Sequence, residues 1–147
     1  MSYITNELYK TLVRELPIAC IDVVIACDNK FLLVKRVQDP LSGQYWLPGG
    51  RLFIGERISE AVSRIVFKEL GVALGNDQDM RFLGITNMIF SESSWGNHIY
   101  HTPATIIKIS LDAKPNICLD CSSSDYIWSD SLPSLLTNQL IYTDSHV

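Results

Sequence analysis

The sequence lacks the features that mark membrane-spanning, nucleic-acid-binding and secreted proteins. It contains no run of about 18 apolar residues, which excludes a membrane-spanning helix. Its 12 Lys and Arg residues are outnumbered by 16 Asp and Glu residues, so no overall basic field favours a nucleic acid or an anionic membrane as partner. The first residues mix charged with apolar side chains and contain no signal-peptide core. We therefore expect a cytoplasmic enzyme or binding protein.

Cysteine is also scarce. Cys20 and Cys27 lie in an apolar, strand-like segment, where a free thiol packs as a small hydrophobic group. Cys118 and Cys121 form a lone C-x-x-C, and no second pair supplies the further ligands that a zinc site needs. The cysteines therefore favour a structural role over metal binding or redox chemistry.

The 147 residues, of which 47% are hydrophobic, are enough for one domain that spans residues 1–147 and buries a core. Hydrophobic periodicity and turn residues predict the following elements. Helices are expected at 6–15, 58–71 and 129–137, and strands at 18–27, 30–36, 44–47, 81–90, 102–111 and 125–128. Strands that surround one central helix, without a repeated strand–helix–strand unit, indicate a mixed α/β fold with a largely antiparallel or mixed sheet.

The central helix carries one apolar stripe, formed by Ile58, Ala61, Val62, Ile65 and Val66. At about 100° per residue, Glu69 lies about 20° from Val62, which places it within or beside that stripe. A carboxylate there is costly unless it is paired or binds a metal, and the alternative is a residue at the edge of the stripe that reaches solvent. Gly71 suits the left-handed position that ends a helix.

Other charged residues leave alternatives open. Asp22 is the only charge in its strand, so it either faces outward or lies near a ligand. Glu56 precedes the helix, where a carboxylate suits the helix dipole. Glu60 lies four residues before Arg64, a spacing that favours an ion pair.

Several residues between Trp46 and Val72 fall at the spacing of one motif. Those that match are Gly50, Glu56, Arg64, Val66, Glu69, Gly71 and Val72. This pattern, G-x5-E-x7-R followed by E-x-G, resembles the Nudix box, and the segment Trp46 to Gly50 before it is also similar to that family. Ile65 and Lys68 stand where the family has glutamates. Loss of both, with Glu69 retained, resembles the GDP-mannose mannosyl hydrolase branch, and that similarity extends from about Leu16 to Leu136.

The resemblance implies the Nudix fold, a mixed β-sheet sandwiched between helices (α/β/α), and a homodimer. It implies Mg2+ (or Mn2+) as cofactor and a small-molecule nucleotide as substrate. The expected reaction is hydrolysis of a nucleoside diphosphate linked to another moiety, most often a sugar, as in GDP-mannose.

The resemblance also suggests a role for each matching residue. Glu69 and the Gly49 carbonyl would bind the metal, which prefers hard oxygen ligands. Arg36 and Arg51 would bind the diphosphate, and Asp22 would lie near the sugar or the leaving group. The supporting residues, which would fix the loop and orient Glu69, are Gly50, Glu56 and Arg64.

The general base is the part of the site that the resemblance does not supply. Ser122 and Ser123 stand where the branch has a Gln ligand and a His base, and serine alone is no general base near neutral pH. The remaining candidates are His98, His101, Glu92, Asp120 and Asp125. We place His98, from a glycine-containing loop, with Arg36 and Asp22 as the catalytic candidates, although either His could equally be structural.

Three functions are therefore compatible with the sequence. The first is a metal-dependent hydrolase of a nucleoside diphosphate sugar. The second is a Nudix hydrolase of another nucleotide class, such as ADP-ribose, a dinucleotide or a nucleoside triphosphate. The third is a catalytically weak Nudix domain that binds nucleotides as a sensor, which the residues at the departing positions favour. Arg36, Arg51 and Glu69 together favour an enzyme.

Overall fold

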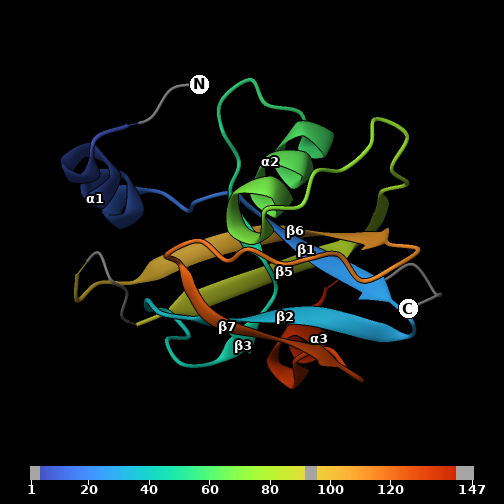
Figure 1. The fold of residues 1–147 in the computed structure, drawn as a ribbon. Helices are drawn as coiled ribbons and strands as arrows, with labels where there is room; N and C mark the ends of the chain where they lie inside the picture. Colours follow the sequence, from blue (N-terminus) through green and yellow to red (C-terminus); the bar gives the residue numbers. More distant parts are fainter. Residues whose placement is uncertain (1–3, 92–95, 142–147) are drawn as a thin grey trace.

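The computed structural model describes residues 4–91 and 96–141. Its elements (Figure 1) are the helices α1 (Asn6–Glu15), α2 (Ile58–Leu70) and α3 (Ser134–Gln139), and the strands β1 (Cys20–Cys27), β2 (Lys30–Arg36), β3 (Tyr45–Trp46), β4 (Gly49–Arg51), β5 (Arg81–Phe90), β6 (Tyr100–Ser110) and β7 (Ser123–Ser129). Within this described part, none of the helices has the length and apolar character needed to cross a membrane.

The strands form one mixed sheet, as predicted. Along its main path the order is β3-β2-β1-β6-β5, with β4 paired to β1 and β7 paired to β2. The β1–β6 pair is parallel and the other pairs are antiparallel. Asp22 stands opposite Gly49 on one side and Ile106 on the other, so the centre of the sheet carries a potential site residue.

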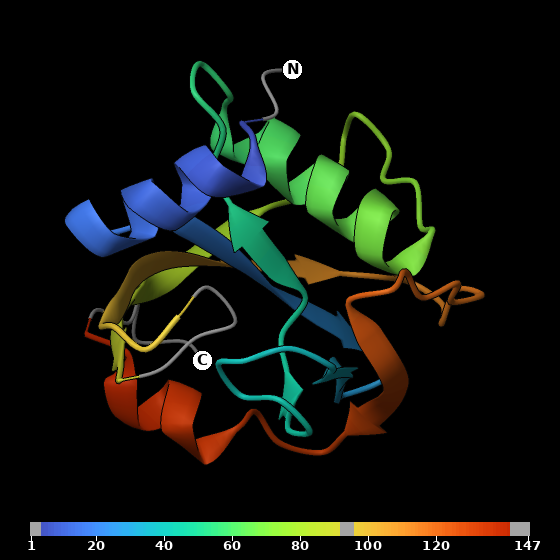
Figure 2. The same ribbon diagram turned by 90° about the vertical axis from the view of Figure 1, so that its left-hand side faces the viewer.

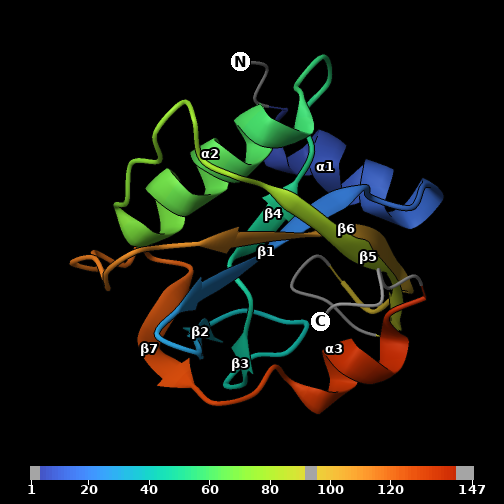
Figure 3. The same ribbon diagram turned by 90° about the vertical axis from the view of Figure 1, so that its right-hand side faces the viewer.

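Alternate residues of the sheet supply two apolar layers. One face, with Ile21 and Val23 of β1, packs against α2. The opposite face, with Val24 of β1, packs against Leu136 of α3. Figures 2 and 3 show α1 and α2 on one side of the sheet and α3 on the other. This arrangement confirms the predicted sandwich of a sheet between helices.

Helix α2 follows the predicted pattern with one correction. Ala61, Val62, Ile65 and Val66 are buried, but Ile58 at the first position of the helix is 43% exposed. Glu69 is buried with the apolar side chains, as its position on the helix predicted. The helix begins after Arg57, whose backbone N–H donates to the Glu60 carboxylate at 2.8 Å, and ends at Gly71 with φ of 69°.

Several strand ends shift by one or two residues from the prediction, and two elements differ by more. The pair Gly49 and Gly50, expected in a loop, belongs to β4, because its backbone completes the sheet beside β1. Helix α3 begins at Ser134 rather than Ser129, because Ser129 still pairs with Phe31 across β7 and β2. The chain between them makes a short turn, in which the Ser129 hydroxyl donates to the Ser131 carbonyl.

Candidate metal and diphosphate site

A cavity of about 310 Å³ opens beside the start of β4 and the end of α2. Six of the predicted site residues line it: Asp22, Arg36, Gly49, Gly50, Arg51 and Glu69. They come from β1, β2, β4 and α2, so the sheet and the helix bring together residues that lie up to 47 positions apart. Lys68, Ser122 and Ser123, three of the four positions that depart from the resembled pattern, also line it.

Glu69 is the buried carboxylate of the cavity, with 9% of the residue exposed. Burial, and then the charge of Asp120, raises the pKa of Glu69 to about 8, while Arg36 and the Gly49 backbone N–H act in the opposite direction. The positive charges and hydrogen-bond donors of the protein therefore do not fully offset the negative charge of the ionised Glu69 carboxylate. A cation that entered the cavity would supply the missing positive charge.

Asp22 lines the cavity, so it is not an outward-facing strand residue, and its place beside a ligand stays a prediction. The Trp46 indole N–H donates to one Asp22 carboxylate oxygen at 3.2 Å. Burial raises the pKa of Asp22 to about 6. A Cβ at Gly49 would lie 2.0 Å from the other carboxylate oxygen, so only glycine fits opposite Asp22.

Two arginines place positive charge in the cavity. The Arg36 Nε–H donates to the Pro40 carbonyl at 3.0 Å, and the Arg51 guanidinium carbon lies 4.5 Å from the centre of the Phe53 ring. In the described part of the chain the ion pairs are formed by other residues, Lys30 with Asp130 and Arg64 with Glu56. Arg36 and Arg51 can therefore bind an anionic ligand.

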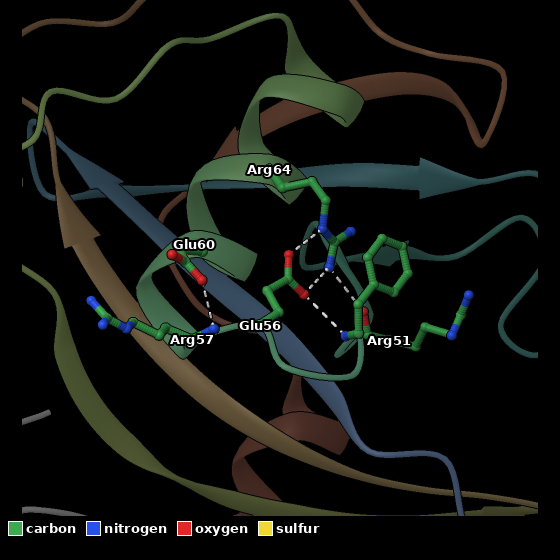
Figure 4. A network of polar contacts seen from close by, with 6 residues as sticks. Arg51, Glu56, Arg57, Glu60 and Arg64 are labelled. Atoms are coloured by element: carbon green, nitrogen blue, oxygen red, sulfur yellow. Dashed lines mark hydrogen bonds and ion pairs between the residues drawn. The ribbon is translucent and has the colours of Figure 1, made fainter. Parts of the chain in front are cut away.

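Glu56 and Arg64 fasten the loop after β4 to helix α2 (Figure 4). The Arg64 guanidinium donates to both Glu56 oxygens, at 2.6 and 2.8 Å, and to the Arg51 carbonyl at 3.0 Å. The Phe53 N–H also donates to Glu56 at 3.0 Å. The predicted Glu60–Arg64 ion pair is wrong. Arg64 pairs with Glu56 instead, and Glu60 accepts a hydrogen bond from the Arg57 backbone N–H. The Glu56–Arg64 pair thus fixes the backbone at Arg51.

None of the four candidate bases that the structure describes, His98, His101, Asp120 and Asp125, lines the cavity. His98 lies beside Gly96 before β6, and the structure gives it no place in the site, so its catalytic assignment is not retained. The His101 Nε2 is 2.6 Å from the Asn87 side-chain oxygen. Asp125 is exposed and accepts a hydrogen bond from the Tyr45 hydroxyl at 2.7 Å. Glu92 lies outside the described residues.

Asp120 differs from the other three because its backbone contacts Glu69, although its side chain does not line the cavity. Its backbone N–H donates to the Glu69 carbonyl at 3.2 Å. One Asp120 oxygen accepts from the Ser122 N–H at 2.9 Å and from the Ser122 hydroxyl at 2.5 Å. Ser122 therefore orients Asp120. The sequence signal for this turn is an Asp two residues before a Ser, which is common in loops and weak by itself.

The residues fit one divalent ion better than a metal cluster. Among the residues that the structure describes, no group of three or more His, Cys, Asp and Glu side chains could hold a metal. Ile65 is fully buried, 3.7 Å below a Cβ at Gly50, so no carboxylate comes from that position. Glu69 and the Gly49 carbonyl offer oxygen atoms, and Mg2+ or Mn2+ takes further oxygens from substrate and water.

One part of the cavity is aromatic and was not predicted. Tyr9 from α1, Phe90 from β5 and Tyr100 from β6 line it. The Phe90 and Tyr100 rings are stacked, with centroids 6.4 Å apart. These residues match no motif, and only the packing of α1 against β6 brings Tyr9 to them. The cavity can therefore accept a ligand with a charged and an aromatic part.

The curated proteins that are similar to this chain include the following two. An ADP-ribose pyrophosphatase of Methanocaldococcus jannaschii is 43% identical over 56 residues, which are 38% of this chain and 33% of that protein. The low-salt glycan biosynthesis protein Agl8 of Haloferax volcanii is 32% identical over 110 residues, which are 74% of this chain and 69% of that protein. The chain thus spans only a third of the length of the first.

A solved structure and a family model agree with these matches. The MutT NUDIX hydrolase of Burkholderia pseudomallei superposes with a TM-score of 0.66 at 27% identity, over 82% of this chain and 89% of that one. The model of the NUDIX domain matches residues 17–128, which include every cavity residue named above from β1 to β7. The chain belongs to the NUDIX domain family.

Proposed function

We propose that this protein is a metal-dependent hydrolase of a nucleoside diphosphate linked to another moiety, with a nucleoside diphosphate sugar such as GDP-mannose as the first candidate. One observation carries the proposal. A buried carboxylate, Glu69, that the protein leaves short of positive charge shares a cavity with two arginines, Arg36 and Arg51. A divalent ion together with a diphosphate satisfies both sets of charges at once.

Each residue of the cavity would have a separate role. Glu69 and the Gly49 carbonyl would hold Mg2+ or Mn2+, which offsets negative charge on the diphosphate when bound. Arg36 and Arg51 would bind phosphate oxygens, because a guanidinium group matches them in a two-pronged geometry. Asp22, at the centre of the sheet, would accept hydrogen bonds from the sugar or the leaving group.

Asp120 completes this assignment. It lies beside Glu69 and is oriented by Ser122, so it would accept a hydrogen bond from water at the metal end of the cavity. In this role a loop supplies the carboxylate that position 65 of the helix lacks.

The relatives favour two substrate classes. Agl8 is named for glycan biosynthesis and matches three quarters of this chain, which supports an activated sugar as substrate. The ADP-ribose pyrophosphatase matches a shorter segment and supports ADP-ribose as the second candidate. In both, the aromatic part formed by Tyr9, Phe90 and Tyr100 would take the base, because a flat ring stacks on aromatic side chains.

We also propose a homodimer, which rests on the resemblance to the GDP-mannose mannosyl hydrolase branch. Light scattering during gel filtration should give twice the monomer mass. A monomer at micromolar concentration would contradict this proposal and leave the assignment of the cavity unchanged.

A substrate screen tests the proposed activity. The protein is incubated with Mg2+ or Mn2+ and GDP-mannose, GDP-glucose, ADP-ribose, a dinucleotide or a nucleoside triphosphate, and the products are separated. We expect turnover of a diphosphate-linked substrate only with metal. Sugar with intact nucleoside diphosphate indicates attack at carbon, whereas nucleoside monophosphate with sugar phosphate indicates attack at phosphorus. Nucleotide binding without turnover would favour the sensor function instead.

A further inference from the structure

Among the three cationic residues that line the cavity, Lys68 is the one to which the assignment above gives no role. It lies in the last turn of α2, directly before Glu69, and both residues line the cavity. The Lys68 side chain is exposed, and it forms neither of the ion pairs found in the described part of the chain. A structural role in the core is therefore excluded.

The charge at position 68 changes the balance between cationic and anionic side chains in the cavity. Three cationic side chains line it, those of Arg36, Arg51 and Lys68, and three carboxylates, those of Asp22, Asp39 and Glu69. The resembled pattern has a glutamate at position 68. That glutamate would leave two cations and add a fourth carboxylate, and such a cavity would need a second metal ion before it accepted a diphosphate.

Lysine removes that need. Its ammonium group is a compact point charge on a flexible chain, and it binds phosphate oxygens as a metal ion does, without requiring further ligands. One carboxylate, Glu69, and the Gly49 carbonyl suit one octahedral ion that keeps several waters.

We propose that Lys68 binds the diphosphate directly, as a built-in cation in place of a second metal ion, so that the site works with one divalent ion per chain. This inference rests on the proposed function, because it assumes a ligand with a diphosphate group. It makes Lys68 a substrate-binding residue and predicts the metal stoichiometry of the site.

Two titrations test it without any turnover. Inorganic pyrophosphate is titrated by calorimetry at saturating Mn2+, and bound Mn2+ is counted by electron paramagnetic resonance at saturating pyrophosphate. The wild-type protein should bind one Mn2+ per chain. Lys68→Met should weaken pyrophosphate binding about 10-fold, the loss expected for one hydrogen bond to a charged group. Lys68→Glu should raise the Mn2+ count from one to two.

Lys114→Met is the matched control, because Lys114 lies 5.4 Å from the Trp128 ring and does not line the cavity. It should leave the affinity for pyrophosphate unchanged. Lys68 is exposed, so its variants should melt within about 2 °C of the wild-type protein, as expected for surface substitutions.

The result that would overturn the inference is unchanged pyrophosphate affinity in Lys68→Met, or two Mn2+ per chain in the wild-type protein. If no substrate is turned over but pyrophosphate binding depends on Lys68, the proposed hydrolysis is refuted and this inference is supported. If the protein turns over a substrate but Lys68→Met does not change its affinity for pyrophosphate, the proposed hydrolysis is supported and this inference is refuted.

Discussion

Glu56 and Arg64 show how a single ion pair maintains the site without entering it. Both side chains are largely buried, with 11% and 17% exposed, and the pair also holds the Phe53 N–H and the Arg51 carbonyl. Its partners lie eight residues apart, across the boundary between the loop and α2. The pair therefore fixes the direction in which the chain enters the helix, and with it the position of Arg51.

We predict that Glu56→Gln lowers the free energy of unfolding by about 3 kcal/mol near neutral pH, because it leaves the Arg64 charge largely buried without a counter-charge. Arg64 holds the pKa of Glu56 below its usual value. A lowered folded-state pKa gives stability that is complete above the unfolded pKa, about 4.3, and that disappears as the pH falls through the folded pKa. The difference between the two proteins should therefore persist at pH 7 and 5 and shrink below pH 4.

Urea unfolding at pH 7, 5 and 3.5 measures this difference. Glu60→Gln is the matched control, because Glu60 is exposed and accepts only the Arg57 N–H; it should cost about 1 kcal/mol or less. A difference for Glu56→Gln that stays constant down to pH 3.5 would show that the charge of Glu56 is not what stabilises the loop.

Helix α2 connects the site to the loop before β7 through its C-terminal end. Gly71 has φ of 69°, and the following loop returns to the helix end, where the Cys118 N–H donates to the Leu70 carbonyl at 2.8 Å. A Cβ at Gly71 would lie 3.0 Å from the Cys118 Cβ. The glycine therefore serves both the helix end and the contact that brings Asp120 to Glu69.

We predict that Gly71→Ala destabilises the protein by about 1–2 kcal/mol through left-handed backbone strain, and by more through the contact with Cys118. Gly55→Ala is the matched control, because Gly55 also has positive φ, 75°, but a Cβ there meets nothing within 4 Å. Denaturant unfolding of the two variants separates strain from contact. Equal losses at positions 55 and 71 would mean that the loop does not pack on the helix end as described.

The elements that the sequence predicts well are those with local signals. Helix α2 has an apolar stripe and a terminal glycine, and β1 and β2 are rich in β-branched or apolar residues with a turn, Asp28 and Asn29, between them. Strand β4 has no local signal, because Gly49–Arg51 becomes a strand only by pairing with β1. The predicted start of α3 was wrong for a similar reason: Ser129 belongs to β7, and β7 forms only by pairing with β2, which is distant in the sequence.

At the scale of the whole molecule, the site combines a part that follows a motif with a part that does not. Arg51, Glu56, Arg64 and Glu69 lie within 19 residues of one another, and the resemblance of this segment to the Nudix box predicted a common site. Tyr9, Tyr100 and the Asp120–Ser122 turn come from distant elements that meet only in the folded chain. The presence of Arg51 and Glu69 in one cavity was therefore predictable, whereas the aromatic residues and the orientation of Asp120 required the structure.

The central claim is that Glu69 binds the divalent ion on which hydrolysis of a diphosphate-linked nucleotide depends. Phosphorus NMR of the reaction with GDP-mannose or ADP-ribose, with Mg2+ and without it, compares the wild-type protein with Glu69→Gln. Glutamine keeps the shape of the side chain and removes a buried charge, so the variant should fold as the wild type does. We predict metal-dependent product formation by the wild-type protein and a loss of at least about 100-fold in Glu69→Gln, consistent with loss of a charge-stabilising group in a dry site. Equal turnover by the two proteins would contradict the account.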